Sequence, residues 1–305
     1  MSKMIRIGTR ESQLAVWQAE KVKELLGGQG YKSELVYIKS DGDTDLKTPL
    51  YELGVQGIFT RALDIALLEG EIDIAVHSMK DVPTIIAKGV TTAAVLPRAS
   101  HKDILVPKPG DSFSDDGRHM VIATSSIRRK AQWLNRYPNS QVENLRGNVN
   151  TRLRKVADSN WNGAIFAAAG LERIGLRPVN AIDLDWMLPA PAQGAILAVC
   201  RENDARCLEA CAHFNDDDTS LCTGVERDFL RALLGGCSTP ISALARVASG
   251  RLIFHGNILS KDGLQKIAIE KEALLADAMN IGHEAASELL ANGGQQILDS
   301  IQNER

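Results

Sequence analysis

The first 97 residues alternate between two hydrophobic patterns. Runs in which every second residue is apolar predict half-buried strands, and apolar residues spaced three and four apart predict amphipathic helices. In chain order these patterns predict a strand at 5–7, a helix at 14–26, a strand at 34–38, a helix at 59–68 and a strand at 72–76. Alternating strands and helices are typical of βαβ units around one sheet.

A second alternating series runs from about residue 104 to residue 170. It predicts a strand at 121–123, a helix from 127, a strand at 142–145, a helix from 150 and an alanine-rich strand at 164–169. Most of the chain is therefore predicted to be α/β, with two similar lobes that face each other across a cleft.

The pattern changes in about the last 85 residues. A helix through 225–234 is followed by strands at 241–247, 252–259 and 267–269, and then by long helical segments. This order predicts a smaller α+β C-terminal domain.

Earlier in the chain, the segment from 39 to 57 is dense in Asp, Gly, Thr and Pro and is longer than the usual connection of about 4 to 6 residues. Such a loop is either disordered or a lid.

Composition and charge exclude several classes of protein. The chain has 305 residues, which suffices for two or three domains, and 44% of them are hydrophobic. No apolar run approaches the roughly 18 residues of a membrane-spanning helix. Residues 1–8 enter a strand pattern directly and lack the features of a secretory signal, so we expect a cytoplasmic protein without a membrane partner. The net charge of −3 gives the whole molecule no electrostatic attraction to nucleic acid.

The five cysteines do not form the pattern of a disulfide framework or of a zinc site, so we expect reduced thiols and no metal. Cys200, Cys207, Cys211 and Cys222 fall in apolar strand or helical patterns, where a cysteine is usually buried and inert. Cys237 lies in the segment Leu-Gly-Gly-Cys-Ser-Thr-Pro, whose glycines predict an exposed turn. Cys237 is therefore the best candidate for a nucleophile.

The second lobe contains a strand-to-helix junction with the features of an anion site. In Ala-Thr-Ser-Ser-Ile-Arg-Arg, the hydroxyls of Thr124, Ser125 and Ser126 gather at the positive end of a helix. Arg128 and Arg129 add positive charge where the helix dipole already disfavours it, and an anion between them would remove this conflict. The alternative interpretation is a simple serine N-cap.

A second junction, Leu-Arg-Gly-Asn-Val-Asn-Thr-Arg, places Arg146, a capping Asn148 and Arg152 in the same kind of position. Arg10 and Arg173 also follow strands, beyond the carboxyl ends where open α/β sheets bind ligands. Because guanidinium groups pair bidentately with carboxylates, these arginines predict a ligand with several carboxylates or phosphates. The alternative for any single arginine is a solvated surface charge.

Polar residues also follow the strand at 72–76, in the segment Val-His-Ser-Met-Lys-Asp-Val-Pro. Asp81 could hold or transfer a proton beside developing positive charge, and Lys80 could bind an acid group. The alternative is a Lys-Asp turn closed by Pro83. We expect His77 to be a packing or hydrogen-bonding residue.

Taken together, these segments resemble the porphobilinogen deaminase family, also called the hydroxymethylbilane synthases, over nearly the whole chain and in one order. The segments that carry the resemblance are 7–15, 73–83, 124–129, 145–149 and the residues after it, 190–194 with Gln193, and 235–237. No fold without this chemistry explains all six.

The resemblance implies a transferase of tetrapyrrole biosynthesis, the route to heme and other porphyrins. Four porphobilinogen units would be joined head to tail, each with loss of ammonia, on a dipyrromethane cofactor attached by a thioether to Cys237. Water would then release hydroxymethylbilane. By similarity, Asp81 contacts pyrrole nitrogens and stabilises cationic intermediates. The resemblance assigns cofactor binding to Lys80, Thr124, Ser125, Ser126, Arg128, Arg129, Arg146 and Asn148, and substrate binding to Arg10, Ser12, Arg152, Arg173 and Gln193.

The resemblance also implies three domains, and we expect the protein to be a monomer. The first two would be lobes like those of periplasmic binding proteins, at 1–97 with 195–214 and at 98–194. The third, at 215–305, would carry the cysteine. One departure from the family concerns the glycine-rich segment before Phe59, where a lysine is usual and this chain has Gln56. That difference leaves the role of the loop open.

Two other functions remain open from the residues alone. One is a non-enzymatic anion-binding protein with the same two lobes, and the other is a phosphate-backbone binder that uses the Ser-Ile-Arg-Arg segment. The missing export signal and the net acidity count against them, and neither explains Cys237 on its glycine turn.

Overall fold

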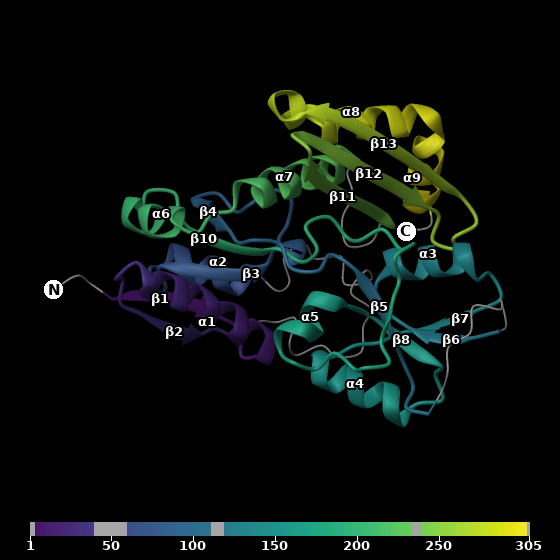
Figure 1. Cartoon of the computed structure of the whole chain (residues 1–305), viewed down its shortest axis with the longest axis horizontal. Coiled ribbons are helices and arrows are strands. Elements are labelled where there is room, and N and C mark those ends of the chain that lie inside the picture. The colour runs from purple at the N-terminus through teal and green to yellow at the C-terminus, as the bar shows by residue number, and fades with distance from the viewer. Residues whose placement is uncertain (1–3, 40–59, 111–118, 234–238, 304–305) are drawn as a thin grey trace. The chain divides into compact units, whose positions relative to one another are not determined.

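A computed structural model describes residues 4–39, 60–110, 119–233 and 239–303 (Figure 1). The described residues form two compact units. The first takes in 4–39, 60–100 and 193–221, and the second takes in 101–110, 119–192, 222–233 and 239–303. Gln56 and Cys237 lie outside the described residues.

The first unit is built on a five-stranded mixed sheet in the order β2-β1-β3-β10-β4. β1 (Ile5–Thr9) pairs in parallel with β2 (Ser33–Tyr37) and β3 (Ile74–Ser78). β10 (Ile196–Arg201) returns from far along the chain and lies antiparallel between β3 and β4 (Val90–Val95). The parallel strands β1 and β3 therefore end at the same edge of the sheet.

The helices of the first unit are α1 (Gln13–Gly28), α2 (Arg61–Leu68) and α6 (Ala205–Ala212). In α1 the buried residues Ala19, Val22 and Leu26 are spaced three and four apart, so they share one helix face. This face packs in one core with β1, β3, β10 and α6. Cys200, Cys207 and Cys211 belong to the same core, and burial raises the pKa of Cys200 to about 11.

The second unit contains a sheet of the same design, in the order β7-β6-β8-β5-β9. β6 (Val121–Ala123) is parallel to β7 (Gln141–Glu143) and β8 (Gly163–Ala167), and β5 (Asp103–Pro107) is antiparallel to β8 and β9 (Ile182–Asp183). In both sheets three parallel strands occupy the first three positions, with β1 or β6 between the other two, and the strand in the fourth position is antiparallel to the third. The prediction of two similar α/β lobes is therefore confirmed.

Each parallel strand of this second sheet leads into a helix. The three helices are α3 (Ile127–Arg136), α4 (Val149–Asp158) and α5 (Ala168–Arg173). Because β6, β7 and β8 run in parallel, the beginnings of these helices lie along one edge of the sheet. That edge holds most of the arginines and hydroxyls that the sequence singled out.

The C-terminal part is a smaller α+β structure, as expected. Its antiparallel sheet is formed by β11 (Ile241–Ala248), β12 (Arg251–Leu259) and β13 (Lys266–Leu274), with α7 (Asp217–Ala232), α8 (Ile281–Leu289) and α9 (Gln295–Asn303) as helices. Phe229 of α7 packs edge-on against Phe254, with ring centroids 5.1 Å apart. The long helical segment predicted at the end of the chain is divided near Gly293, whose φ of +106° interrupts the helix.

From Cys222 onward, the C-terminal part belongs to the same compact unit as the second lobe. Gln132 of α3 donates to the hydroxyl of Ser242 in β11 over 3.0 Å, and Asn135 donates to the carbonyl oxygen of Gly263 over 2.7 Å.

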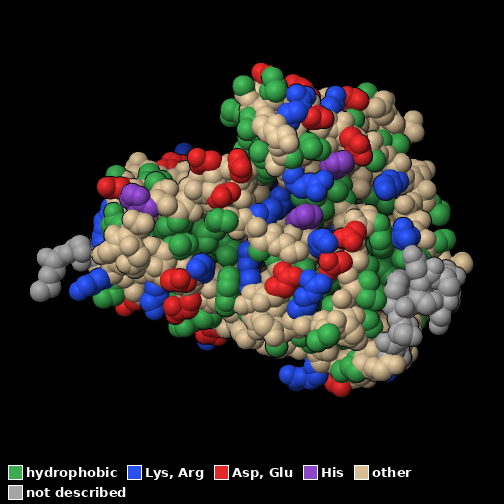
Figure 2. Space-filling model, viewed as in Figure 1, with side chains coloured by type: hydrophobic (Ala, Val, Ile, Leu, Met, Phe, Trp, Pro, Cys, Tyr) green, Lys and Arg blue, Asp and Glu red, His purple; other side chains and the backbone are tan. Residues whose placement is uncertain are grey.

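Acidic and basic side chains are interspersed over the face drawn in Figure 2. Among the described residues, no helix has the length and apolar character needed to cross a bilayer.

Candidate functional site

At the end of β1, Ser12 and Arg10 occupy the edge of the first sheet. Ser12 begins α1 as its N-cap, and its hydroxyl accepts the N–H of Ala15 over 3.4 Å. Arg10 is half-buried, and its charge acts on the buried His77 at the end of β3. Burial first and Arg10 second lower the pKa of His77 to about 4. The structure therefore places Arg10 near β3, and the burial of His77 is consistent with the packing or hydrogen-bonding role that we expected.

The neutral, buried state of His77 gives the stability of the protein a pH dependence. An unfolded histidine has a pKa of about 6.5, so the contribution is complete above that value and is lost as the pH falls toward 4. We expect the free energy of unfolding to fall by about 2 kcal/mol between pH 7 and pH 5 through this residue. Urea unfolding of His77→Gln should show a smaller loss, whereas the same change at the exposed His213 should leave the wild-type slope. Equal slopes in all three proteins would contradict the assignment.

The segment after β3 brings Lys80 and Asp81 to the same edge. Met79–Asp81 forms a 3-10 turn directly after the strand. The Lys80 Nζ donates to the Oε1 of Gln193 over 3.2 Å, although the two residues are 113 positions apart in the chain. Gln193 is fully buried, and Asp81 is exposed. Two residues that only the resemblance associated, Lys80 and Gln193, are thus in contact.

In the second unit, Ser125 links the two junctions that the sequence predicted to be anion sites. Its hydroxyl accepts the N–H of Leu145 over 3.0 Å and lies 2.6 Å from the Oδ1 of Asn144. Ser126 begins α3 as its N-cap, and Thr124 and Ser125 are buried. The serine N-cap that the sequence left as an alternative is present. The structure therefore shows both this N-cap and a contact between the two junctions.

Arg128 and Arg129 require a correction. The sequence placed a ligand anion between them, but the anion between them in this structure is the buried carboxylate of Asp103, the first residue of β5. Arg128 Nη2 lies 2.7 Å from Asp103 Oδ2, and Arg129 donates from Nε and Nη2 to Oδ1. Arg129 also donates to the carbonyl oxygen of Ile165. The guanidinium of Arg129 therefore donates to acceptors of the protein itself, whereas the Nε of Arg128 has no partner among the described residues.

The second junction holds Arg146, Asn148 and Arg152. Asn148 begins α4 and accepts the N–H of Thr151 over 2.9 Å, and Arg152 donates to the carbonyl oxygen of Gly147 over 2.6 Å. Gly147 has a φ of +113°, and a Cβ there would lie 2.8 Å from the side chain of Thr151. Only glycine therefore suits this turn. Arg146, beside it, is 4% exposed.

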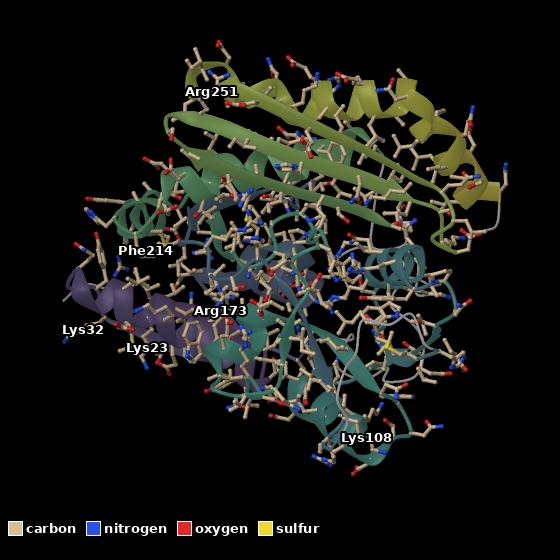
Figure 3. The ribbon with its side chains drawn as sticks, turned by 45° about the vertical axis from the view of Figure 1, so that its right-hand side comes forward. Lys23, Lys32, Lys108, Arg173, Phe214 and Arg251 are labelled. Carbon is tan, nitrogen blue, oxygen red and sulfur yellow. The ribbon has the colours of Figure 1, made fainter. Side chains whose placement is uncertain are left out.

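Arg173 is the last residue of α5, and it follows β8 along the chain (Figure 3). Its side chain is half-buried, and burial lowers its pKa to about 10, while Glu172 opposes that effect. A partly desolvated guanidinium of this kind is favourable only where an anion compensates it.

Sequence reasoning missed Glu226, a fully buried residue of α7. Its carboxylate accepts the N–H of Ala192 over 2.6 Å and the N–H of Ala245 over 2.7 Å. Ala192 has a φ of +61°, which is uncommon for a residue with a side chain, and it directly precedes Gln193. The only signal in the sequence was an acidic residue within the apolar stripe formed by Val225, Phe229 and Leu233.

The prediction that Cys200, Cys207, Cys211 and Cys222 are buried is confirmed. Cys222 lies in α7, and burial raises the pKa of Cys211 to about 12. Within the described ranges, no group of three or more His, Cys, Asp or Glu residues could hold a metal ion.

Comparisons with known proteins agree on one family. Residues 5–209 match the family described as porphobilinogen deaminase, dipyrromethane cofactor binding domain, and residues 220–291 match porphobilinogen deaminase, C-terminal domain. The porphobilinogen deaminase of Syntrophotalea carbinolica is 42% identical over 304 residues, covering 98% of this chain and 96% of that protein. The chloroplastic porphobilinogen deaminase of Pisum sativum is 40% identical, covering 97% of this chain and 84% of that protein.

Two solved structures show a looser similarity. One is an ancestral cationic amino acid solute binding protein, with 15% identity, a TM-score of 0.44 and coverage of 69% of this chain and 87% of that one. The other is the methionine binding protein MetQ, with 13% identity, a TM-score of 0.43 and coverage of 71% of this chain and 92% of that one. The assignment of the two lobes rests on their strand orders. The two family matches and the full-length relatives show that this chain belongs to the porphobilinogen deaminase family.

Proposed function

We propose that this protein is a transferase that joins four porphobilinogen units into hydroxymethylbilane on a covalent dipyrromethane cofactor. The observation that carries the proposal is the match to the family's cofactor-binding domain, which spans the Asp81 turn and both anion-binding junctions. The same match argues against the phosphate-backbone binder and the non-enzymatic anion-binding protein. The proposal includes a monomer in the cytoplasm and the three-domain division given above.

The residues of the second unit fit the cofactor. A dipyrromethane built from two porphobilinogen units carries acetate and propionate groups, so its site must present cations and hydroxyls. Arg128, Arg129 and Arg146 are all buried, while Asp103 is the carboxylate that lies against the first two. The buried hydroxyls of Thr124 and Ser125 adjoin them. Guanidinium groups and hydroxyls of this kind are the groups that bind carboxylates.

We assign cofactor binding, substrate binding and charge stabilisation to different residues. We propose that Lys80, the two junctions and Arg128 hold the cofactor's acid groups, Arg128 through the Nε that has no partner in the described part of the chain. Arg129 would act by fixing Asp103 and Arg128. Arg10, Ser12, Arg152, Arg173 and Gln193 would bind or orient the substrate. The exposed carboxylate of Asp81 would stabilise positive charge as ammonia leaves. When bound, the cofactor supplies the pyrrole carbon to which the chain is extended.

Attachment of the cofactor to Cys237 is part of the proposal. Of the five cysteines, the four described ones are buried and have no access to a ligand at the sheet edges. A kinetic comparison of Gln56→Lys with wild type would measure the effect of Gln56 on turnover.

Intact mass spectrometry and an activity assay test the function together. The purified protein should exceed its sequence mass by two pyrrole units, should redden with Ehrlich's aldehyde reagent, and should convert porphobilinogen into hydroxymethylbilane with release of ammonia. A protein of unmodified mass that binds porphobilinogen without converting it would favour the non-enzymatic anion binder instead.

Arg146→Leu should impair cofactor loading and turnover more than stability. A charge-assisted bond to a carboxylate contributes about 1.5 to 3 kcal/mol, so the loss in turnover should be roughly tenfold or more. Arg146→Lys should restore only part of it, because an ammonium lacks the planar fork of arginine. Arg154→Leu, an exposed position of the same α4, is the matched control. Normal turnover and a normal series of bound intermediates in Arg146→Leu would remove this residue from the cofactor site.

A further inference from the structure

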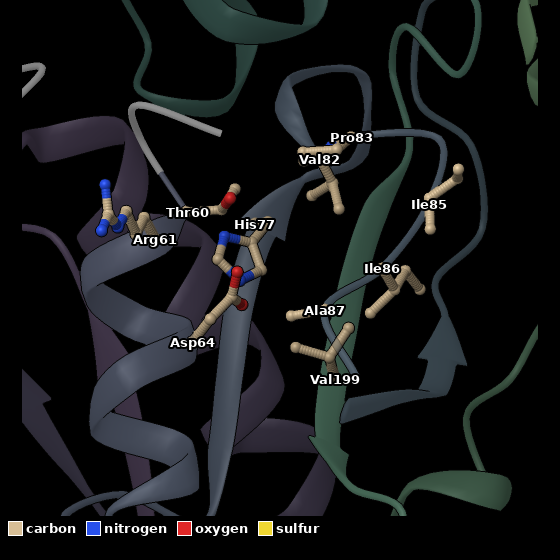
Figure 4. A pocket seen from close by; sticks show the side chains of 10 residues that line it. All are labelled: Thr60, Arg61, Asp64, His77, Val82, Pro83, Ile85, Ile86, Ala87 and Val199. Atoms are coloured by element: carbon tan, nitrogen blue, oxygen red, sulfur yellow. The ribbon is translucent and has the colours of Figure 1, made fainter. Parts of the chain in front are cut away.

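A cavity of about 250 Å³ opens in the first unit, next to the turn that carries Asp81 (Figure 4). Val82 and Pro83, which follow Asp81 along the chain, form part of its lining. All of the described residues that line it belong to the first unit. The cavity is therefore distinct from the two junctions of the second unit that are assigned above to the cofactor.

His77 is a buried polar residue in the lining of this cavity. The residue lines the cavity and is 6% exposed, and its Nε2 has no hydrogen-bond partner among the described residues. The ring is neutral at neutral pH, so one of its nitrogens can accept a hydrogen bond. Because a buried polar nitrogen without a partner is unfavourable, an N–H group of a ligand would bind well there.

Helix α2 adds a carboxyl group and a guanidinium group to the same cavity. Asp64 is half-buried and bonded to Thr60, and burial raises the pKa of its carboxyl. An ammonium group of a ligand would favour the ionised carboxylate and offset that burial. Arg61 lies at the exposed start of the helix, where it can pair with a carboxylate that reaches out of the cavity.

The remaining wall is apolar. Val82, Ile86 and Val199 come from the segment after Asp81 and from β10, and they lie across from His77 and Asp64 (Figure 4). An apolar wall with a few polar groups is typical of a small-molecule site. The cavity is smaller than the 300 to 1,000 Å³ of sites for drug-sized ligands, yet much larger than the roughly 30 Å³ of one water. Its size therefore suits a single substituted ring better than a two-ring cofactor.

We propose that this cavity is a second binding site for a monopyrrole amine, which under the proposed function is porphobilinogen itself. The pyrrole N–H would donate to His77, the aminomethyl group would pair with Asp64, and one acid group would pair with Arg61. The ring would pack against Val82 and Ile86. The inference rests on the proposed function and adds to it a site that holds substrate beside the Asp81 turn.

Steady-state kinetics of two variants test the site. Asp64→Asn keeps the size of the side chain and removes its charge, and Ile86→Trp fills the cavity. Each should raise the KM for porphobilinogen about tenfold, more than it lowers kcat, because the change removes binding rather than chemistry. Glu69→Gln, which removes one exposed acid just after α2, should match wild type.

A direct binding measurement covers the case in which these variants do not fold. The full-length Asp81→Asn variant, labelled with ¹⁵N-histidine, should show a shift of the His77 resonances when porphobilinogen is added at concentrations that saturate wild-type turnover. The His213 resonances should not move. An unchanged His77 spectrum, or wild-type KM values in both variants, would overturn the second site while leaving hydroxymethylbilane formation intact. If the wild-type protein forms no hydroxymethylbilane, the proposed function itself fails, and this inference fails with it.

Discussion

Cys237→Ser should fold and yet show no detectable turnover. A serine hydroxyl cannot form the proposed thioether to the cofactor, so the purified variant should have the mass of its sequence alone. The glycine-rich segment around residue 237 predicts a turn, and a turn residue contributes little to core packing, so the free energy of unfolding of the polypeptide itself should change by only about 0.5 kcal/mol. Intact mass, turnover and urea unfolding of the same preparation provide the three measurements.

The four buried cysteines supply the matched controls. Cys222→Ala removes a thiol from α7, in the same compact unit as the described residues that flank position 237. It should keep the covalent adduct and lose only the small stability that a buried sulfur contributes. An adduct found on any cysteine other than Cys237 would overturn the attachment, and so would an adduct retained by Cys237→Ser.

The strands and helices of both lobes could be predicted because their patterns are local. α3 begins at Ile127 as expected, since Ser126 caps it and an apolar strand precedes it. β13 is longer than predicted and runs over Lys266–Leu274. Its charged residues hid the strand pattern, but all nine of its residues pair with β12. Hydrogen bonding along the whole edge thus outweighed the local composition.

Pairings between distant segments could not be predicted in the same way. Nothing near Asp103 indicates that two arginines 25 and 26 positions later will share its carboxylate. That contact depends on β5 entering the sheet antiparallel beside β8. The conflict between Arg128, Arg129 and the helix dipole correctly indicated an anion, but a local pattern cannot tell a ligand from a carboxylate of the chain. The same limit applies to Glu226, whose two partners come from different segments.

Asp81→Asn should separate binding from chemistry. The change keeps the size of the side chain and most of its hydrogen bonding but removes the negative charge that would stabilise a pyrrole cation as ammonia departs. Because Asp81 is exposed at the end of a 3-10 turn, the substitution should not disturb the core. The variant should therefore retain its cofactor. Positioned acid–base groups contribute typically 10² to 10⁴-fold, so each addition should slow by roughly a hundredfold or more.

Single-turnover mass spectrometry can follow every step of this reaction. If one carboxylate serves all four condensations, loading of the first pyrrole unit and release of the final product should both be slow in Asp81→Asn, rather than one of them alone. Glu71→Gln, which removes an exposed acid just before β3, should add units at the wild-type rate. Wild-type rates in Asp81→Asn would leave Asp81 as a residue of the turn closed by Pro83. A defect confined to one step would instead indicate that different groups serve different condensations.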